Sequence, residues 1–479
     1  MSKQYETVIG LEVHVELSTK TKIFCGCSTA FGAKPNANTC PVCTGMPGAL
    51  PVLNKKVVEY AVAVGLAADC EITRDIRFDR KNYFYPDNPQ NYQISQLYFP
   101  VCRNGKIAIP TKDGGEKWIR IHEIHMEEDA GKLKHEEKEN RSVIDFNRSG
   151  VPLIEIVSEP DLRSGEEAVE YLNKLRLMIQ YLGVSDCKLQ EGSMRADVNL
   201  SVREAGSVSY GVRTEMKNLN SMKAILRAVE HEKNRQIQLL AEGKNVIQET
   251  RRWDDGRGCS YPMRSKEDAK DYRYFPDPDL VSVHISEEWI LEIKKRQPEF
   301  RSEKIKRYQT EFGLPRYDAE VLTGDKALAD FFEKTVQLCS RPKKVSNWLM
   351  GETMRLLNEK AMEPNDIPFS PKHLAKLIEL TESGAIGTTL AKEVFEVLFA
   401  QNIDPERYIE EQGLKTVEDT QELNHIIEQV VKKYPKSVED YKNGRKKAIG
   451  FLIGQIMKAT QGRANPTLAK EMLEKRFVQ

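Results

Sequence analysis

Three segments within the first 220 residues alternate between apolar and polar side chains. In residues 9–17 every odd position is apolar, whereas the even positions, after one glycine, are Glu12, His14 and Glu16. The alternation recurs in residues 195–203 and, more briefly, in residues 212–217. Successive side chains of a β-strand point to opposite faces, so this pattern is typical of strands buried on one face only. It predicts an antiparallel sheet with one covered and one polar face.

The polar residues of these strands are types that bind cations and phosphates. Glu12 and His14 share a strand face roughly 6.6 Å apart. The second segment presents Arg195, Asp197 and Asn199 on its polar face, and the third presents Arg213, Glu215 and Lys217. Residues 204–211 join these two segments, which favours a hairpin. A merely solvated face is the alternative for any one strand, but such faces usually carry Lys, Glu, Thr and Ser rather than these mixtures.

Two further acidic features join this set. The run Glu127-Glu128-Asp129 follows two histidines, and Glu155 lies inside the apolar run of residues 151–157. A carboxylate within such a run is either buried and paired or bound to an ion. Several carboxylates and a histidine on one sheet face suit Mg²⁺, which is held through few protein ligands together with phosphate oxygens.

Four of the nine cysteines fall within residues 25–43. They form two close pairs, separated by twelve residues: Cys25, Cys27, Cys40 and Cys43. Two such pairs across a loop have the spacing of a four-cysteine zinc knuckle, in which a filled coordination shell leaves only a structural role. Reduced thiols, an iron–sulfur cluster or disulfides are the alternatives.

The character of the chain changes near residue 290. Strand patterns and Gly/Pro turns dominate before it, and helical patterns follow, which predicts an α+β protein. We expect a catalytic domain at 1–293, a helical domain at 294–407 and a tail domain at 408–479. No apolar run reaches the ~18–20 residues of a membrane helix, and the charged N-terminal segment does not resemble a signal peptide. A cytoplasmic protein without a membrane contact is expected.

The formal net charge of zero hides a segregation of charge. Residues 441–479 contain nine basic and two acidic residues, a balance of +7, so the remaining residues sum to −7. A positive terminal module on a mildly acidic body is typical of a polyanion-binding appendage. An ordinary solvated helix surface is the alternative.

Several long motifs make the chain resemble the B-subunit family of the bacterial and organellar aspartyl/glutamyl-tRNA amidotransferase. In the first 280 residues they read ETVIGLEVHVEL (6–17), RFDRKNYFYPDNPQNYQISQ (77–96), HMEEDAGK (125–132), PLIEIVSEPD (152–161), EGSMRADVN (191–199), EMKNLNS (215–221) and DYRYFPDPDL (271–280). The tail matches through VEDYKNGRKKAIGFLIGQIMKATQGRANP (438–466). The archaeal glutamyl-specific relative carries a large insertion for which this chain has no room.

The resemblance implies a fold and an activity. The N-terminal domain is expected to resemble the antiparallel catalytic fold of glutamine synthetase. With ATP and Mg²⁺, it would phosphorylate the side-chain carboxylate of glutamate or aspartate mischarged on tRNA(Gln) or tRNA(Asn). Ammonia released from glutamine by the A subunit would then attack the acyl phosphate. The implied assembly is a heterotrimer with the A and C subunits.

The family motifs also suggest roles for particular residues. They imply an Mg²⁺ site made of Glu12, His14, Glu128 and Glu155, with Glu128 also catalytic. Arg195, Asp197, Asn199 and Lys217 would line the nucleotide and acyl-phosphate pocket, where Arg195 and Lys217 would contact the nucleotide. Lys81 is expected where ammonia arrives, with an ordinary surface lysine as the alternative. The residues expected to bind tRNA are Arg445, Lys446, Lys447, Lys458 and Arg463.

Two other functions remain open from the sequence. A non-catalytic RNA-binding scaffold would leave the Glu-x-His pair and Glu155 unexplained. A free-standing ATP-dependent carboxylate–amine ligase would act on free glutamate and ammonia without tRNA. The sequence offers no serine triad or N-terminal cysteine for releasing ammonia from glutamine, so the nitrogen is expected from a partner or from bulk ammonia.

Overall fold

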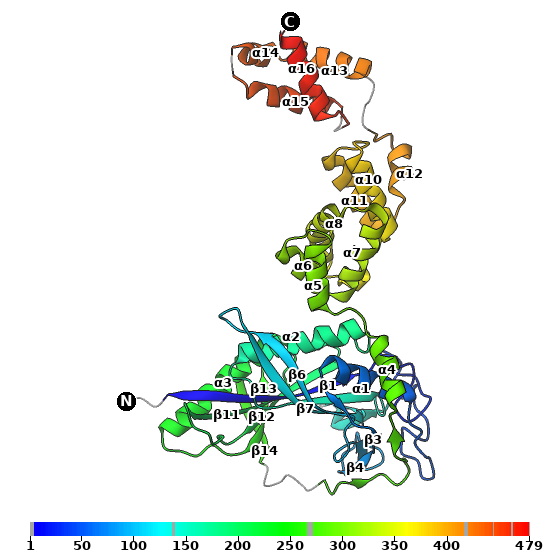
Figure 1. The fold of residues 1–479 in the computed structure, drawn as a ribbon, viewed down its shortest axis with the longest axis vertical. Helices are drawn as coiled ribbons and strands as arrows, with labels where there is room; N and C mark the ends of the chain where they lie inside the picture. The colour runs from blue at the N-terminus through cyan, green and yellow to red at the C-terminus, as the bar shows by residue number, and fades with distance from the viewer. Residues whose placement is uncertain are drawn as a thin grey trace. The chain divides into compact units, whose positions relative to one another are not determined.

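A computed structural model describes residues 4–136, 139–265, 272–415, 420–443, 445–460 and 463–478 (Figure 1). The chain divides into two compact units, residues 1–300 and 301–479. The first contains the sheets and the second, as far as it is described, contains only helices and loops. The predicted α+β class is therefore confirmed. The three-domain division with boundaries at 293 and 407 stays a prediction.

A nine-stranded sheet is the centre of the first unit. Its strand order is β14-β13-β12-β11-β1-β10-β7-β6-β2, and all neighbours are antiparallel except β12 and β13. The strand bounds are β1 Tyr5–Glu16, β2 Glu71–Ile72, β6 Cys102–Pro110, β7 Glu116–Glu128, β10 Pro152–Ser158, β11 Met194–Glu204, β12 Thr214–Lys217, β13 Glu249–Asp254 and β14 Cys259–Ser265. The three alternating segments of the sequence thus become neighbouring strands, and the predicted hairpin is the pair β11 and β12.

Three small sheets complete the strands of this unit. The first has the order β15-β4-β5, and the other two pair β16 with β3 and β8 with β9. Their strand bounds are β3 Asp75–Ile76, β4 Asp79–Asn82, β5 Tyr92–Ser95, β8 Lys132–Glu136, β9 Arg141–Asp145, β15 Phe275–Pro276 and β16 Val283–His284.

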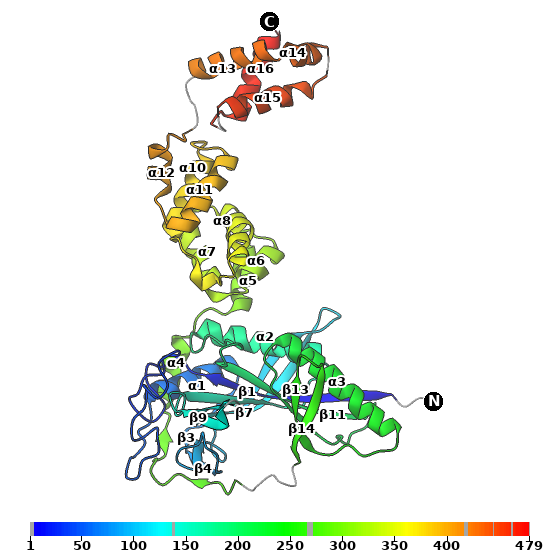
Figure 2. The same ribbon diagram turned by 180° about the vertical axis from the view of Figure 1, so that it is seen from behind.

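Helices cover the apolar face of the large sheet. Helices α1 (Lys55–Ala67), α2 (Gly165–Leu182) and α3 (Met222–Ala241) lie on one side of it, as both views show (Figures 1 and 2). The fourth helix of the unit is α4 (Glu287–Lys295). The odd-numbered side chains of β1 enter the core beneath these helices, so its even-numbered polar residues point to the opposite face.

Helix α2 begins and ends where its sequence predicts. The Ser164 hydroxyl accepts a hydrogen bond from the backbone N–H of Glu167, and Gly183 ends the helix with a φ of 69°. A positive φ costs glycine little, which explains its use as the helix terminator.

The second unit is built from helices around two hydrophobic cores. One core gathers apolar residues between Tyr308 and Ile409, and the other gathers residues between Leu423 and Leu473. No helix among the described residues is long and apolar enough to cross a membrane. The bounds are α5 Arg301–Thr310, α6 Arg316–Leu322, α7 Lys326–Cys339, α8 Pro342–Trp348, the π-helix Leu349–Thr353, α9 Met354–Glu359, the 3₁₀-helix Pro364–Asp366, α10 Pro371–Glu382, α11 Thr388–Gln401, α12 Pro405–Glu411, α13 Thr420–Lys433, α14 Pro435–Lys442, α15 Ala448–Ala459 and α16 Pro466–Val478.

The close approach of α1 to strand β6 predicts a sensitive position. A Cβ at Gly65 would lie 2.2 Å from the Sγ of Cys102. We expect Gly65→Ala to lower the free energy of unfolding by about 1–3 kcal/mol, the usual cost of overpacking a core. Thermal denaturation measures the change. Adding Cys102→Ala removes the clashing sulfur and should recover part of the loss; an unchanged melting temperature in Gly65→Ala would contradict this packing.

Candidate functional site

The strand register aligns polar side chains across the uncovered face of the large sheet. His14 of β1 lies opposite Arg195 of β11 on one side and opposite Glu155 of β10 on the other, and Glu155 lies opposite His125 of β7. Two residues earlier in β1, Glu12 lies opposite Asp197 of β11. Residues paired across neighbouring strands share a face, so the register itself brings these side chains together.

The first cluster, which we call the histidine cluster, consists of His14, His125, Glu127 and Glu155. The Nε2 atom of His14 lies 3.4 Å from Oε2 of Glu155 and 3.6 Å from Oε1 of Glu127. Nε2 of His125 lies 3.0 Å from the same oxygen of Glu155. Candidate ligand atoms of His14, Glu127 and Glu155 all lie within 4.8 Å of one another. Oxygen ligands with one imidazole fit a divalent cation that keeps further positions for water or phosphate.

Charges in the histidine cluster depend on one another. Burial would lower the pKa of His125, but the carboxylates of Glu155 and Glu123 outweigh burial and raise it to about 10. Burial would also lower the pKa of His14, but the Glu155 carboxylate outweighs burial and raises it. Glu155 is desolvated too, yet its two histidine partners hold its pKa well below the usual range. Positive charge facing these carboxylates is therefore strongly stabilised, as a cation site requires.

The structure brings Glu127, and not Glu128, into this cluster. Adjacent residues of a strand face opposite ways, so Glu127 shares the face of His125 while Glu128 points to the other side. Oε1 of Glu128 accepts hydrogen bonds from Nε2 of Gln90 at 2.6 Å and from the backbone N–H of Ile94 at 2.9 Å. The structure therefore places Glu128 on the other face of β7 from Glu127 and does not bring it together with His14 and Glu155, with which a shared metal site was predicted.

A second cluster, which we call the lysine cluster, contains Glu12, Asp197, Glu215 and Lys217. Candidate ligand atoms of its three carboxylates lie within 4.8 Å of one another. Nζ of Lys217 lies 2.5 Å from Oδ2 of Asp197 and 2.9 Å from Oε1 of Glu215. Asn199 donates a hydrogen bond of 2.9 Å to Oε1 of Glu12. Glu12, which was predicted to share a site with His14 and Glu155, thus has ligand atoms close to those of Asp197 and Glu215, while burial and the Glu155 carboxylate raise its pKa.

Arg195 is held beside the histidine cluster by Asp129, a member of the acidic run 127–129 that received no individual role from the sequence. Its Nη2 lies 3.1 Å from Oδ2 of Asp129, and Nε of Arg148 lies 3.3 Å from the same oxygen. Burial and the neighbouring Asp129 raise the pKa of Glu16 to about 7. The two guanidinium groups and two carboxyl groups form a network at one end of β1.

Lys81 extends from β4 toward the histidine cluster. Burial would lower the pKa of its ammonium group, but the carboxylates of Glu127 and Glu155 and the nearby tyrosines raise it instead. Its Nζ lies 5.1 Å from the ring centroid of Tyr272. Lys81 is thus a half-buried residue whose ammonium group lies near the carboxylates of Glu127 and Glu155.

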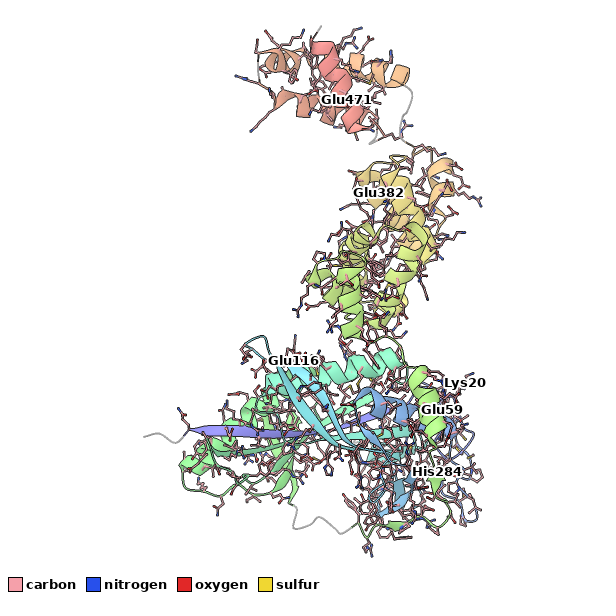
Figure 3. The ribbon with its side chains drawn as sticks, viewed as in Figure 1. Lys20, Glu59, Glu116, His284, Glu382 and Glu471 are labelled. Carbon is pink, nitrogen blue, oxygen red and sulfur yellow. The ribbon has the colours of Figure 1, made fainter. Side chains whose placement is uncertain are left out.

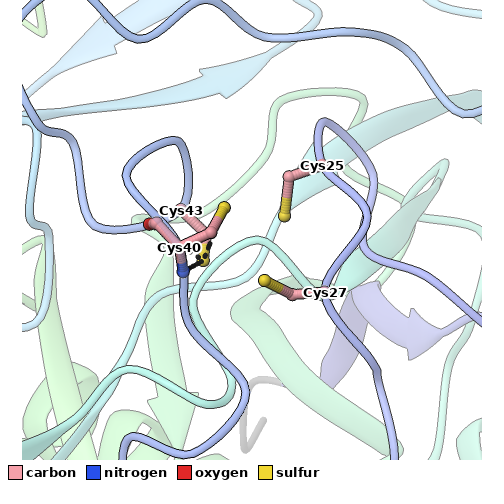
Figure 4. Close-up of side chains that lie close together, drawn as sticks. All are labelled: Cys25, Cys27, Cys40 and Cys43. Carbon is pink, nitrogen blue, oxygen red and sulfur yellow. Dashed lines mark hydrogen bonds between the residues drawn. The ribbon is translucent and has the colours of Figure 1, made fainter.

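The four cysteines of residues 25–43 come together as their spacing predicts. They lie on two turns that face each other, with their sulfur atoms directed into a common space (Figure 4). All four are free thiols, and the four sulfur atoms lie within 4.8 Å of one another. The Sγ atoms of Cys40 and Cys43 are 3.9 Å apart, against about 3.8 Å between ligands of a tetrahedral zinc–thiolate site. The cluster can hold a metal ion.

The predicted tRNA-binding residues surround the start and end of α15. Arg445, Lys446, Lys447 and Lys458 are exposed, whereas Arg463 is half-buried and donates to the backbone oxygen of Thr460. Arg445 pairs with Asp440 at 3.1 Å. The apolar stripe of α15 enters the core shared with α13 and α16, which leaves its basic flanks on the surface.

The sequence did not assign Glu127, His125, Asp129, Arg148 or Glu215 to the site. The alternation of side chains along β7 would have identified Glu127, because residues two apart in a strand share a face and Glu127 lies two residues after His125. The same spacing relates Glu12 and His14 in β1. No comparable signal identifies Arg148, which is in the loop before β10 and reaches Asp129 only through the fold.

Comparison with known proteins first defines a class. The family model described as the GatB/GatE catalytic domain matches residues 7–291, and the model described as the GatB domain matches residues 330–477. The chain therefore combines a catalytic domain of this type with a C-terminal GatB domain.

Full-length relatives then give the family. The chain is 64% identical over 471 residues to the B subunit of the aspartyl/glutamyl-tRNA(Asn/Gln) amidotransferase of Agathobacter rectalis, covering 98% of this chain and 99% of the relative. Proteins with the same name from Lachnospira eligens and Caldicellulosiruptor bescii are 64% and 56% identical, each over 98% of this chain and over 99% and 98% of their own. This chain belongs to the family of aspartyl/glutamyl-tRNA(Asn/Gln) amidotransferase B subunits, as its motifs predict.

The environment of Glu128 leads to a prediction about pH. Burial raises the pKa of Glu128 to about 8, although its two hydrogen-bond donors act in the opposite direction. Between about pH 4.5 and 8 the folded state keeps a proton that the unfolded state releases, so the contribution of Glu128 to stability falls as pH rises through this window. Glutamine has no such proton. We expect Glu128→Gln to stabilise the fold by a few kcal/mol more at pH 8.5 than at pH 5.

Denaturant unfolding of both proteins at the two pH values measures this difference. The other titrating groups are common to wild type and variant, and so they cancel in the comparison. A difference in unfolding free energy that is the same at pH 5 and pH 8.5 would contradict a buried, protonated Glu128.

Proposed function

We propose that this chain activates the side-chain carboxylate of glutamate on tRNA(Gln), of aspartate on tRNA(Asn), or of both. A carboxylate oxygen attacks the γ-phosphorus of ATP, and ADP leaves. Ammonia attacks the carbonyl carbon of the resulting acyl phosphate, and the amide forms as phosphate leaves and a proton is lost. The proteins of this chain's family are subunits of a tRNA-dependent amidotransferase. The histidine cluster, beside Arg195 on one sheet face, carries the proposal.

The chemistry explains why such a face is needed. A carboxylate resists ammonia until one of its oxygens becomes a phosphate leaving group, and phosphoryl transfer depends on positioning and on neutralising charge. A bound Mg²⁺ ion would supply positive charge to the phosphate oxygens. His14, Glu127 and Glu155 are the residues that would hold it, since their ligand atoms converge within 4.8 Å.

The cationic side chains have complementary roles in this proposal. Arg195 contacts phosphate oxygens, and Asp129 holds its guanidinium in place. Lys217 contacts the nucleotide or the acyl phosphate from the lysine cluster. In that cluster Asp197 positions Lys217, and Asn199 positions Glu12. Lys81 faces Glu127 and Glu155 and is the residue at which we place the arrival of ammonia.

The remaining parts of the chain support the assembly. We propose that the A subunit supplies ammonia and that the A and C subunits complete a heterotrimer, which acts on its tRNA substrates in the cytoplasm. The four cysteines hold structural zinc, because their filled coordination shell leaves no open position for a substrate. The exposed basic residues around α15 contact tRNA phosphates.

Neighbouring glutamates on opposite faces of β7 provide a matched test. We expect Glu127→Gln to weaken Mn²⁺ binding, followed by electron paramagnetic resonance, and to lower ATP-dependent transamidation by about a hundredfold or more. Glu128→Gln is the control and should leave Mn²⁺ affinity within a few-fold of wild type. Glutaminase activity of the assembled complex should survive in both variants. Equal loss of Mn²⁺ binding in the two would refute the assignment of Glu127.

Substrate dependence separates this proposal from its rivals. The wild-type complex should consume ATP only with a mischarged tRNA. ATP consumption with free glutamate and ammonia would identify a free-standing ligase, whereas tRNA binding without any ATP turnover would identify a scaffold.

The basic residues before α15 give a second test. If Arg445, Lys446 and Lys447 each neutralise a tRNA phosphate, replacing all three with alanine should reduce the slope of log affinity against log salt by about 2–3 in magnitude. Filter binding over a salt series measures the slope. As a control, alanines at Lys432, Lys433 and Lys436 remove the same amount of charge from α13 and α14 and should change the slope less. An unchanged slope after replacement of residues 445–447 would show that these residues contact no phosphate.

A further inference from the structure

Lys22 is a fully buried lysine next to the four-cysteine cluster. Its side chain is 0% exposed. Nζ lies 3.4 Å from Sγ of Cys43 and donates a hydrogen bond of 3.1 Å to the backbone oxygen of Phe146. Within the described part of the chain, no carboxylate lies within ion-pair distance of this ammonium group. A buried ammonium group is costly unless an anion pairs with it, so the thiolate of Cys43 is the partner that the structure offers.

The charge of the cluster requires such a partner. Four thiolates around one Zn²⁺ ion carry a net charge of −2, and Cys43 is the buried member of the four. The Lys22 ammonium group, 3.4 Å from Sγ of Cys43, offsets part of this negative charge. An N–H donor on a thiolate sulfur also fixes the orientation of the ligand, as hydrogen bonds from outside the coordination shell do in other metal sites.

The second hydrogen bond of Lys22 connects the cluster to the sheet. Phe146 lies in the loop that leads into β10, the strand of Glu155. Ser149 of the same loop donates a hydrogen bond of 2.9 Å to the backbone oxygen of Cys43. Lys22 therefore contacts a metal-ligand residue and the loop at once.

We propose that Lys22 is the counter-ion of the four-cysteine metal site, pairing with the Cys43 thiolate and tying it to the loop at Phe146. The inference rests on the proposed zinc site. It predicts that loss of the Lys22 charge weakens zinc binding without removing any ligand, by about tenfold to a hundredfold.

The test measures zinc content and the Zn²⁺ dissociation constant of the full-length chain by competition with a chelator. We expect Lys22→Met to raise the dissociation constant by about tenfold to a hundredfold. Lys22→Arg, which keeps the charge, should remain closer to wild type. Lys22→Gln keeps a donor without the charge and should lie between them. Lys20→Met is the control, because Lys20 is exposed two residues away (Figure 3).

The outcomes separate the two levels of the proposal. A wild-type protein without zinc, or zinc content unchanged in Cys40→Ser, overturns the zinc site itself. Zinc in wild type that is lost in Cys40→Ser, combined with an unchanged dissociation constant in Lys22→Gln, overturns only the role of Lys22. Far-UV circular dichroism identifies any unfolded variant, and the absorption of the Co²⁺-substituted Lys22→Arg and Lys22→Gln proteins gives a second readout, since a changed hydrogen bond to sulfur shifts the thiolate-to-cobalt band.

Discussion

The pairing of β1 with β10 and β11 is the constraint on which the candidate site depends. This strand contributes His14 and Glu12, and its neighbours contribute Glu155, Arg195 and Asp197 through direct cross-strand pairs. A slip of one residue in either pairing would turn a neighbour's polar side chains into the core beneath the helices. The apolar residues between the polar ones, buried against α1, α2 and α3, are what prevent this slip. Core packing and site geometry are thus set by the same alternation.

Concentrating so much charge on a sheet face creates a problem that the structure solves internally. In the histidine cluster, His14 and His125 face Glu127 and Glu155, and in the lysine cluster, Lys217 lies between two carboxylates. Each group of carboxylates is therefore matched by side-chain cations. A divalent cation or a phosphate that binds here must rearrange these pairs, so binding is an exchange of partners and not the filling of a bare anionic surface.

The sequence predicted the strands of the site well because the signal was local. Alternation in β1 and β11 and the caps of α2 need only nearest neighbours along the chain, and the structure confirms them. In β7 two adjacent glutamates point to opposite faces, so the face that each one takes depends on its parity relative to His125. Arg148 and Asp129 could not be found in this way, because they meet through a loop whose path is fixed by tertiary packing. The division of Glu12 and His14 between two clusters likewise depends on neighbouring strands, and β1 alone does not reveal it.

The four-cysteine segment is part of the sheet unit and not an appendage to it. The backbone N–H of Asn36 donates to Oδ1 of Asp145 at 2.9 Å, and that of Asn38 donates to Oδ1 of Asn147 at 2.8 Å. Asp145 ends β9 and Asn147 lies in the loop between β9 and β10, so the segment is hydrogen-bonded to the residues that lead into β10. The position of Glu155 depends on the start and register of β10. A shift of the cysteine segment would therefore be transmitted to Glu155, and so to the histidine cluster, through these hydrogen bonds and the short loop that follows them. In the proposed function, a metal ion that rigidifies the segment would therefore act on the histidine cluster through the position of β10.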